Sequence, residues 1–104
     1  MIRNAFKMKL KPGTVEEYKK RHDEIWPELS TAHSDAGIFD YSIYFDEESL
    51  TLFAFQKLTD DNTADGLKDL EIVKKWWDHM ADLMEVCPNN MPVFAPLREV
   101  FHMD

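Results

Sequence analysis

The chain has 104 residues, 44% of them hydrophobic, and its 12 basic and 20 acidic residues give a net charge of −8. This length is typical of one domain, and the acidic balance disfavours partners that carry phosphate or anionic lipid. We therefore expect a single domain over residues 1–104 that binds neither nucleic acid nor membrane.

Cysteine usage and hydropathy indicate the compartment and the assembly. Cys87 is the only cysteine, so the chain forms no internal disulfide. No apolar run approaches the length of a membrane span, and the first residues lack the core of a signal peptide. We expect a cytoplasmic protein. Because so small a domain leaves much apolar surface uncovered, we also expect a second copy to pack against it.

The first element is a strand. Residues 2–10 alternate between apolar and basic side chains, which is the pattern of a half-buried strand. Lys11-Pro12-Gly13 ends it. Thr14, with Glu17 three residues later, predicts a capping box at the start of a helix.

The helix that follows carries a stripe in steps of three and four residues. The stripe consists of Val15, Tyr18, His22, Ile25 and Leu29. Pro27 should end or bend this helix near Trp26, after which residues 28–36 can resume it.

Gly37 ends the helical region and precedes a predicted hairpin. Two strand-like runs, residues 38–45 and 50–57, are joined by Asp46-Glu47-Glu48-Ser49, which has the composition of a turn. Bulky groups stand on both faces of residues 38–45, so one sheet face would need a further cover. Face-to-face dimerisation would supply that cover.

The second half of the chain predicts one loop, one long helix and one strand. Residues 59–66 are polar and read as a loop. A second helical stripe, ending before Pro88, consists of Leu70, Val73, Trp77, Met80 and Met84. A proline-containing loop then leads to a strand at about Leu97–Met103. The order β-α-β-β-α-β predicts a ferredoxin-like α+β fold, an antiparallel sheet with both helices on one face.

His22 is the residue most suggestive of chemistry. It follows Tyr18 by one helical turn, so both side chains point towards the sheet. A histidine there is commonly a core residue satisfied by a neighbour. Two buried polar heads together, however, favour a polar ligand, and imidazole both gives and takes protons near neutral pH.

Trp76 and Trp77 differ by about 100° around their helix, so they cannot both face the core. Trp77 fits the apolar stripe, whereas Trp76 is displaced to its edge, where its ring could wall a pocket. Indoles stack on the C–H faces of sugars, so the pair beside Tyr18 and His22 suits a carbohydrate. Two packing tryptophans are an equally simple interpretation.

Other chemistry is not supported by the sequence. His33, His79, His102 and Cys87 show no metal-binding spacing, and no glycine-rich phosphate loop is present.

Several segments together carry a family resemblance along the whole chain. They are Met1-Ile2-Arg3-x-Ala5-Phe6, Glu17-Tyr18-x-x-Arg21-His22-x-x-Ile25-Trp26-Pro27-Glu28-Leu29, Gly37-x-x-x-Tyr41-Ser42-Ile43-Tyr44, Leu52-Phe53-Ala54 and Trp76-Trp77-x-x-Met80. With these segments the chain resembles the L-rhamnose mutarotases. It departs from the family at Ala64, Leu70 and Val73, where Trp, Thr and Cys are usual.

The resemblance implies a homodimer of the dimeric α+β barrel type that interconverts the α and β anomers of L-rhamnose without a cofactor. It implies that His22 is the proton donor and that Tyr18, Tyr41, Trp76 and Trp77 bind the sugar. The group that takes the anomeric proton stays open between Tyr41, a carboxylate and water.

Two other functions are compatible with the same fold. One is a cofactor-independent monooxygenase of the dimeric α+β barrel superfamily, whose substrates are quinol-like or haem-like. The other is a non-catalytic module that binds a small ligand.

Overall fold

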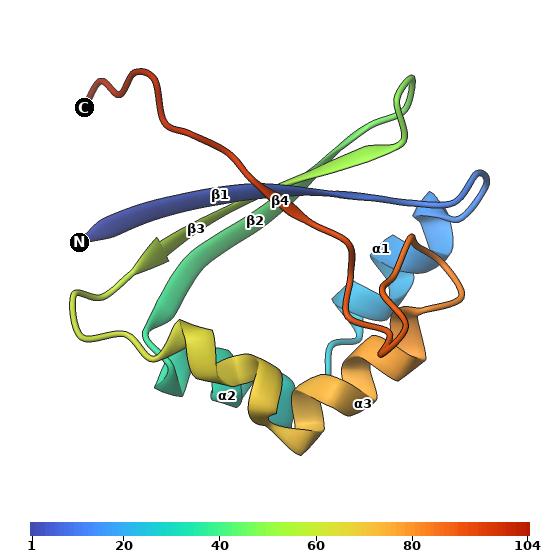
Figure 1. The fold of residues 1–104 in the computed structure, drawn as a ribbon, viewed down its shortest axis with the longest axis horizontal. Coiled ribbons are helices and arrows are strands. Elements are labelled where there is room, and N and C mark those ends of the chain that lie inside the picture. Colours follow the sequence, from blue (N-terminus) through green and yellow to red (C-terminus); the bar gives the residue numbers. More distant parts are fainter.

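A four-stranded antiparallel sheet carries all of the helices on one of its faces (Figure 1). The computed structural model describes residues 1–104. The strands are β1 (Ile2–Lys9), β2 (Ile38–Asp46), β3 (Thr51–Leu58) and β4 (Ala95–Pro96), and they pair in the order β2-β3-β1-β4. The predicted ferredoxin-like α+β fold is confirmed.

The helical layer consists of α1 (Val15–Asp23), α2 (Pro27–Asp35), the 3-10 helix η1 (Ala64–Asp69) and α3 (Glu71–Met80). The predicted break in the first helix is confirmed, because α1 ends three residues before Trp26 and Pro27 is the first residue of α2. Proline suits a first helical position, where the N–H that it lacks would have no helical partner. Gly37 then turns the chain into β2 with φ +88°.

The core lies between the sheet and the helices. Met8 and Leu10 are buried while Lys7 and Lys9 are exposed, so the alternation predicted for the first strand is confirmed. The main buried cluster consists of Met8, Leu10, Tyr18, Leu52, Ala54, Met80, Leu83 and Met84.

The predicted capping box is wrong. Thr14 occupies the N-cap position, but its hydroxyl lies 2.8 Å from the carbonyl oxygen of Lys11 and 3.0 Å from that of Leu83. Glu17 pairs instead with Arg21 on the next turn of α1. Neither side chain therefore caps the first turn of α1: Thr14 binds outside the helix, and Glu17 binds one turn further along it.

The C-terminal half differs from expectation in three places. Residues 64–69, predicted in part as loop, form η1, and α3 ends at Met80, short of Met84. After Met80 the chain tightens into a turn, in which the N–H of Leu83 donates to the Met80 carbonyl at 3.0 Å, and the Leu83 carbonyl accepts the backbone N–H of Lys11 at 2.9 Å.

The last strand is two residues long and lies at 95–96, not at Leu97–Met103. Pro96 has no N–H to donate, and only Leu97 continues the pairing, with its N–H 2.9 Å from the carbonyl of Ala5. The chain then leaves the sheet on the side away from the helices (Figure 1).

The outer sheet face, opposite the helices, carries exposed aromatic side chains. Tyr44 is 65% exposed and Phe55 45% exposed, and their rings lie 5.9 Å apart. A hollow of about 550 Å³ lies on this side, between residues 97–101 and strands β1 and β3. None of the helices has the length and apolar character needed to cross a membrane.

Candidate active site

Tyr18 and His22 form the centre of the candidate site. They stand one turn apart on α1, and their rings stack with centroids 4.3 Å apart. Tyr18 is only 7% exposed, and His22 is half-buried. The prediction that both side chains point into the same region is confirmed.

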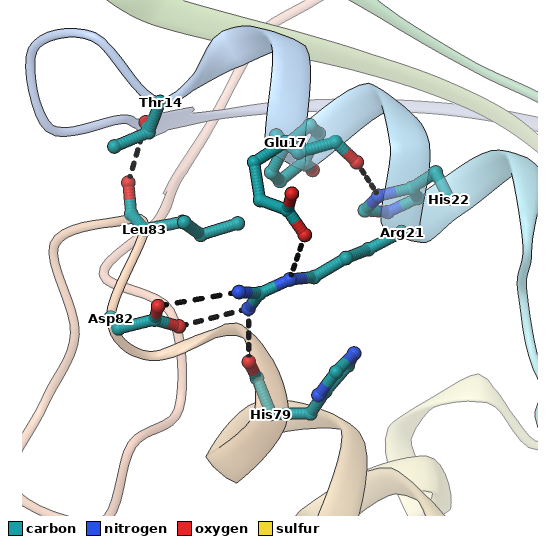
Figure 2. Close-up of polar contacts among 8 residues, drawn as sticks. Thr14, Glu17, Arg21, His22, His79, Asp82 and Leu83 are labelled. Atoms are coloured by element: carbon teal, nitrogen blue, oxygen red, sulfur yellow. Dashed lines mark hydrogen bonds and ion pairs between the residues drawn. The ribbon is translucent and has the colours of Figure 1, made fainter.

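The orientation of the His22 ring is set by its own helix. Its Nδ1 lies 3.0 Å from the backbone carbonyl oxygen of Tyr18 (Figure 2). A carbonyl oxygen only accepts hydrogen bonds, so Nδ1 carries the proton and donates it. In the neutral ring, Nε2 then keeps its lone pair, and no protein group hydrogen bonds with it.

Burial lowers the pKa of His22 below its ordinary value of 6.5, and the hydrogen bond to the Tyr18 carbonyl offsets this effect only in part. Near neutral pH the residue is therefore an uncharged imidazole with a free Nε2. Such a group is poised to accept a proton first and to return it afterwards.

Trp76 is the aromatic partner of His22. The two rings meet edge to face with centroids 5.3 Å apart, and Trp76 packs against the main core cluster. The expectation that Trp77 fills the core stripe and Trp76 lies at its edge is wrong. Trp76 packs against the cluster that contains Met80, and Trp77, about 100° around the helix, does not.

Two residues that the sequence interpretation did not assign to the site join it here. The Trp26 ring lies 5.0 Å from that of Trp76, and the His79 ring lies 5.3 Å from Trp26 and 5.5 Å from Trp76. Their spacing carried a signal, since Trp26 follows His22 by four residues and His79 follows Trp76 by three.

Tyr41 reaches the helix side of the sheet because of a β-bulge. Pairing of β2 with β3 shifts between Phe39 and Ser42, so that Asp40 and Tyr41 together stand opposite Gln56. Asp40 adopts φ +48°, the left-handed region that Asp tolerates better than most residues. The extra residue changes which face the strand presents. Tyr41 therefore points inwards, with its ring 6.1 Å from that of His33.

The two phenols are held in their neutral form. The surrounding protein raises the pKa of Tyr18 above its ordinary value and that of Tyr41 to about 12, and Gln56 offsets part of the latter effect. Tyr41 is 39% exposed by area, so this shift reflects the atoms packed around its phenol more than overall burial. Burial is the larger cause of the raised pKa of Tyr18, and Tyr41 contributes to it.

The Tyr18 hydroxyl has no hydrogen-bond partner in the protein. Every fully buried side-chain polar atom does have a partner, so this hydroxyl is not fully buried and stays partly accessible to solvent. The site as a whole offers a free imidazole nitrogen, neutral phenols and flat indole surfaces, which together suit an uncharged polyhydroxylated ligand. Two hollows of the surface, of about 210 Å³ and about 550 Å³, are lined by none of the predicted site residues.

Comparison with known proteins gives a consistent result. The sequence profile of the L-rhamnose mutarotase family matches residues 3–103. L-rhamnose mutarotases of Bacteroides thetaiotaomicron and Phocaeicola vulgatus are 59% and 56% identical over 104 residues, covering 100% of both chains in each case.

Solved structures agree. The crystal structure of L-rhamnose mutarotase from Formosa agariphila matches with a TM-score of 0.93 and 55% identity, covering 100% of each chain. A Pseudomonas aeruginosa crystal structure, with TM-score 0.58 and 13% identity over 95% of this chain and 93% of its own, shares the fold alone. The family matches do not favour the monooxygenase or the non-catalytic module.

Proposed function

The chain belongs to the L-rhamnose mutarotase family, and on this premise we propose that His22 is the acid/base centre with which it interconverts the α and β anomers of L-rhamnose. The observation that carries the assignment is the free Nε2 of a neutral, half-buried imidazole whose other nitrogen is held by the Tyr18 carbonyl. The enzyme is an isomerase acting on a sugar.

Mutarotation requires one proton to leave the anomeric hydroxyl and one to reach the ring oxygen. As the first proton leaves, the anomeric carbon forms a carbonyl and its bond to the ring oxygen breaks. The open chain rotates about the bond beside the aldehyde, and the reverse steps close the ring on the other face. Both oxygens are bonded to the same carbon, so one nitrogen can serve both in turn.

His22 fits this sequence in its neutral form. Nε2 takes the anomeric proton, and the imidazolium so formed donates a proton to the ring oxygen. The role of proton donor therefore follows an earlier step in which the same nitrogen acts as base. Each positioned proton transfer accelerates a reaction roughly 10²–10⁴-fold.

We assign the sugar contacts to Tyr18, Tyr41, Trp76 and Trp77. The unpartnered Tyr18 hydroxyl and the neutral Tyr41 phenol would hydrogen bond with sugar hydroxyls. Trp76, beside His22, would stack on the C–H face of the ring. Trp77 is half-buried but outside the ring cluster around His22, so its contact would be with a more distant part of the sugar.

We further propose that the protein acts as a homodimer in the cytoplasm. The exposed rings of Tyr44 and Phe55 lie together on the outer sheet face, and a second copy placed face to face would cover them. The free thiol of Cys87 suits a reducing compartment.

The role of His22 can be tested by measuring the rate of L-rhamnose anomer exchange with NMR saturation transfer. His22→Ala should lower the enzyme-catalysed exchange rate by roughly 10²–10⁴-fold, the value of a positioned proton transfer. His102→Ala is the matched control, because His102 lies near the C-terminus away from the site and should leave exchange unchanged. Exchange at the wild-type rate in His22→Ala would refute the assignment.

A further inference from the structure

The side chain of Arg21 joins α1 to the end of α3 (Figure 2). Its guanidinium binds Asp82 through two hydrogen bonds, Nη1–Oδ1 at 2.9 Å and Nη2–Oδ2 at 3.3 Å. Nη1 also donates to the backbone carbonyl of His79, in the last turn of α3. On its own helix, Nε donates to Glu17 at 2.8 Å.

All three guanidinium nitrogens of Arg21 thus donate to protein atoms, and the side chain is only 18% exposed. The guanidinium also holds the pKa of the Asp82 carboxyl below its usual range. A cation so fully occupied is not available for an anionic ligand. Its contacts instead fix the position of one helix relative to the other.

The contacts of Arg21 with Asp82 and with the His79 carbonyl form a clamp between α1 and α3, and this clamp lies next to the proposed site. Arg21 precedes His22 in the sequence, and the His79 carbonyl that it binds belongs to a residue whose ring contacts Trp76. The other end of α1 is tied separately, because the Thr14 hydroxyl binds the carbonyl of Leu83 (Figure 2). The backbone N–H of Lys11 donates to the same carbonyl. With both ends fixed, α1 cannot slide along α3 without breaking a polar contact.

We propose that Arg21 is a positioning residue of the mutarotase reaction, which sets the placement of the His22 ring against Trp76 by clamping α1 to α3. The inference rests on the proposed function of His22. Proton transfer depends steeply on geometry, and a misplacement of about 1 Å costs up to about 10²-fold in rate. A planar guanidinium suits this task because its bidentate pairing with a carboxylate restrains direction as well as distance.

The experiment compares variants at both ends of the clamp. Arg21→Met removes it from α1, and Asp82→Asn weakens it from the α3 side with a smaller change to the fold. Both should lower kcat for L-rhamnose anomer exchange at least tenfold, with a smaller change in KM. Because they remove one shared interaction, the double variant should lose little more than Arg21→Met alone.

Two controls separate the clamp from ordinary surface pairing. Lys19→Ala removes the pair between Lys19 and Asp23, at 2.7 Å, which lies within α1 and does not reach α3. This variant should keep kcat within twofold of wild type. Glu17→Gln should have an effect smaller than that of Asp82→Asn, since Glu17 lies on α1 itself.

A spectroscopic measurement distinguishes positioning from general stability. The pKa of His22, followed by NMR of its ring in folded protein, should rise towards 6.5 in Asp82→Asn, because a displaced ring is more hydrated, whereas loss of the carboxylate charge alone would lower this pKa. Lys19→Ala should leave this pKa unchanged.

Each outcome decides the proposal. Folded Arg21→Met and Asp82→Asn with wild-type kcat and an unshifted His22 pKa would overturn it, even if both melt at lower temperature. An equal loss of kcat in Lys19→Ala would also overturn it. Failure of the proposed function looks different, since the wild type would then leave L-rhamnose exchange unaccelerated or His22→Ala would retain activity.

Discussion

Replacing Tyr18 by Phe removes one oxygen from the candidate site and leaves the ring in place. The ring belongs to the main core cluster and stacks on His22, so the packing of α1 should not change. The hydroxyl has no hydrogen-bond partner in the protein. We therefore expect activity and stability to respond in different ways.

The expected changes in sugar binding and in Tm follow because the Tyr18 hydroxyl has no partner within the protein. A net hydrogen bond contributes about 0.5–1.5 kcal/mol, so losing one to the sugar should weaken binding about two- to twelvefold. The folded protein loses no internal hydrogen bond and buries less polar surface. In a domain of this size about 1 kcal/mol shifts Tm by about 4–8 °C, so we expect Tm to fall by less than about 4 °C or to rise.

The assay combines thermal unfolding with saturation transfer at several concentrations of L-rhamnose. Tyr44→Phe is the matched control, because it makes the same chemical change at a ring that is 65% exposed on the outer sheet face. Its KM should match that of wild type. A large fall in Tm for Tyr18→Phe would show that the hydroxyl stabilises the fold, and an unchanged KM would show that it does not contact the sugar.

Three further predictions concern pH, backbone conformation and assembly. Burial lowers the pKa of His22, so the folded protein favours the uncharged imidazole, and the free energy of unfolding should decline as the pH falls below 6.5. The rate of anomer exchange should fall on the acid side with a midpoint below pH 6.5. A midpoint above 6.5 would contradict the role of His22. Gly37→Ala should lower the free energy of unfolding by more than about 1 kcal/mol in urea titrations, because a side chain at φ +88° is strained and its Cβ would clash with the Thr59 hydroxyl oxygen. Phe55→Lys should convert the proposed dimer to a monomer in light scattering, and an undiminished mass would place the interface elsewhere.

The elements that the sequence predicted well are those with strong periodicity. The alternation in residues 2–10, the helical stripe through Tyr18 and His22, and the break at Pro27 depend on local physics that the fold preserves. Their predicted bounds differ from the observed ones by a few residues at most. For the same reason the pairing of Tyr18 with His22 could be predicted without any tertiary information.

The errors lie where distant parts of the chain compete for the same groups. The hydroxyl of Thr14 binds beyond its own helix because the Leu83 carbonyl is brought beside it by the fold. Trp76 and Trp77 lie on adjacent sides of α3, so the way in which α3 packs beside α1 decides which ring meets His22. Neither fact is contained in a window of neighbouring residues.

The β-bulge at Asp40 and Tyr41 has a consequence for how this gene can change. Ahead of it Ile38 faces the core, and after it the facing positions are odd-numbered, so Tyr41 and Ile43 point inwards. The bulge is therefore one residue added to an otherwise alternating strand. A deletion of Asp40 would remove the bulge and leave Ile38, Tyr41 and Ile43 all facing the helices, whereas a deletion of Ser42 would turn either Tyr41 or Ile43 outwards. We expect in-frame loss of the Ser42 codon to lower activity far more than in-frame loss of the Asp40 codon.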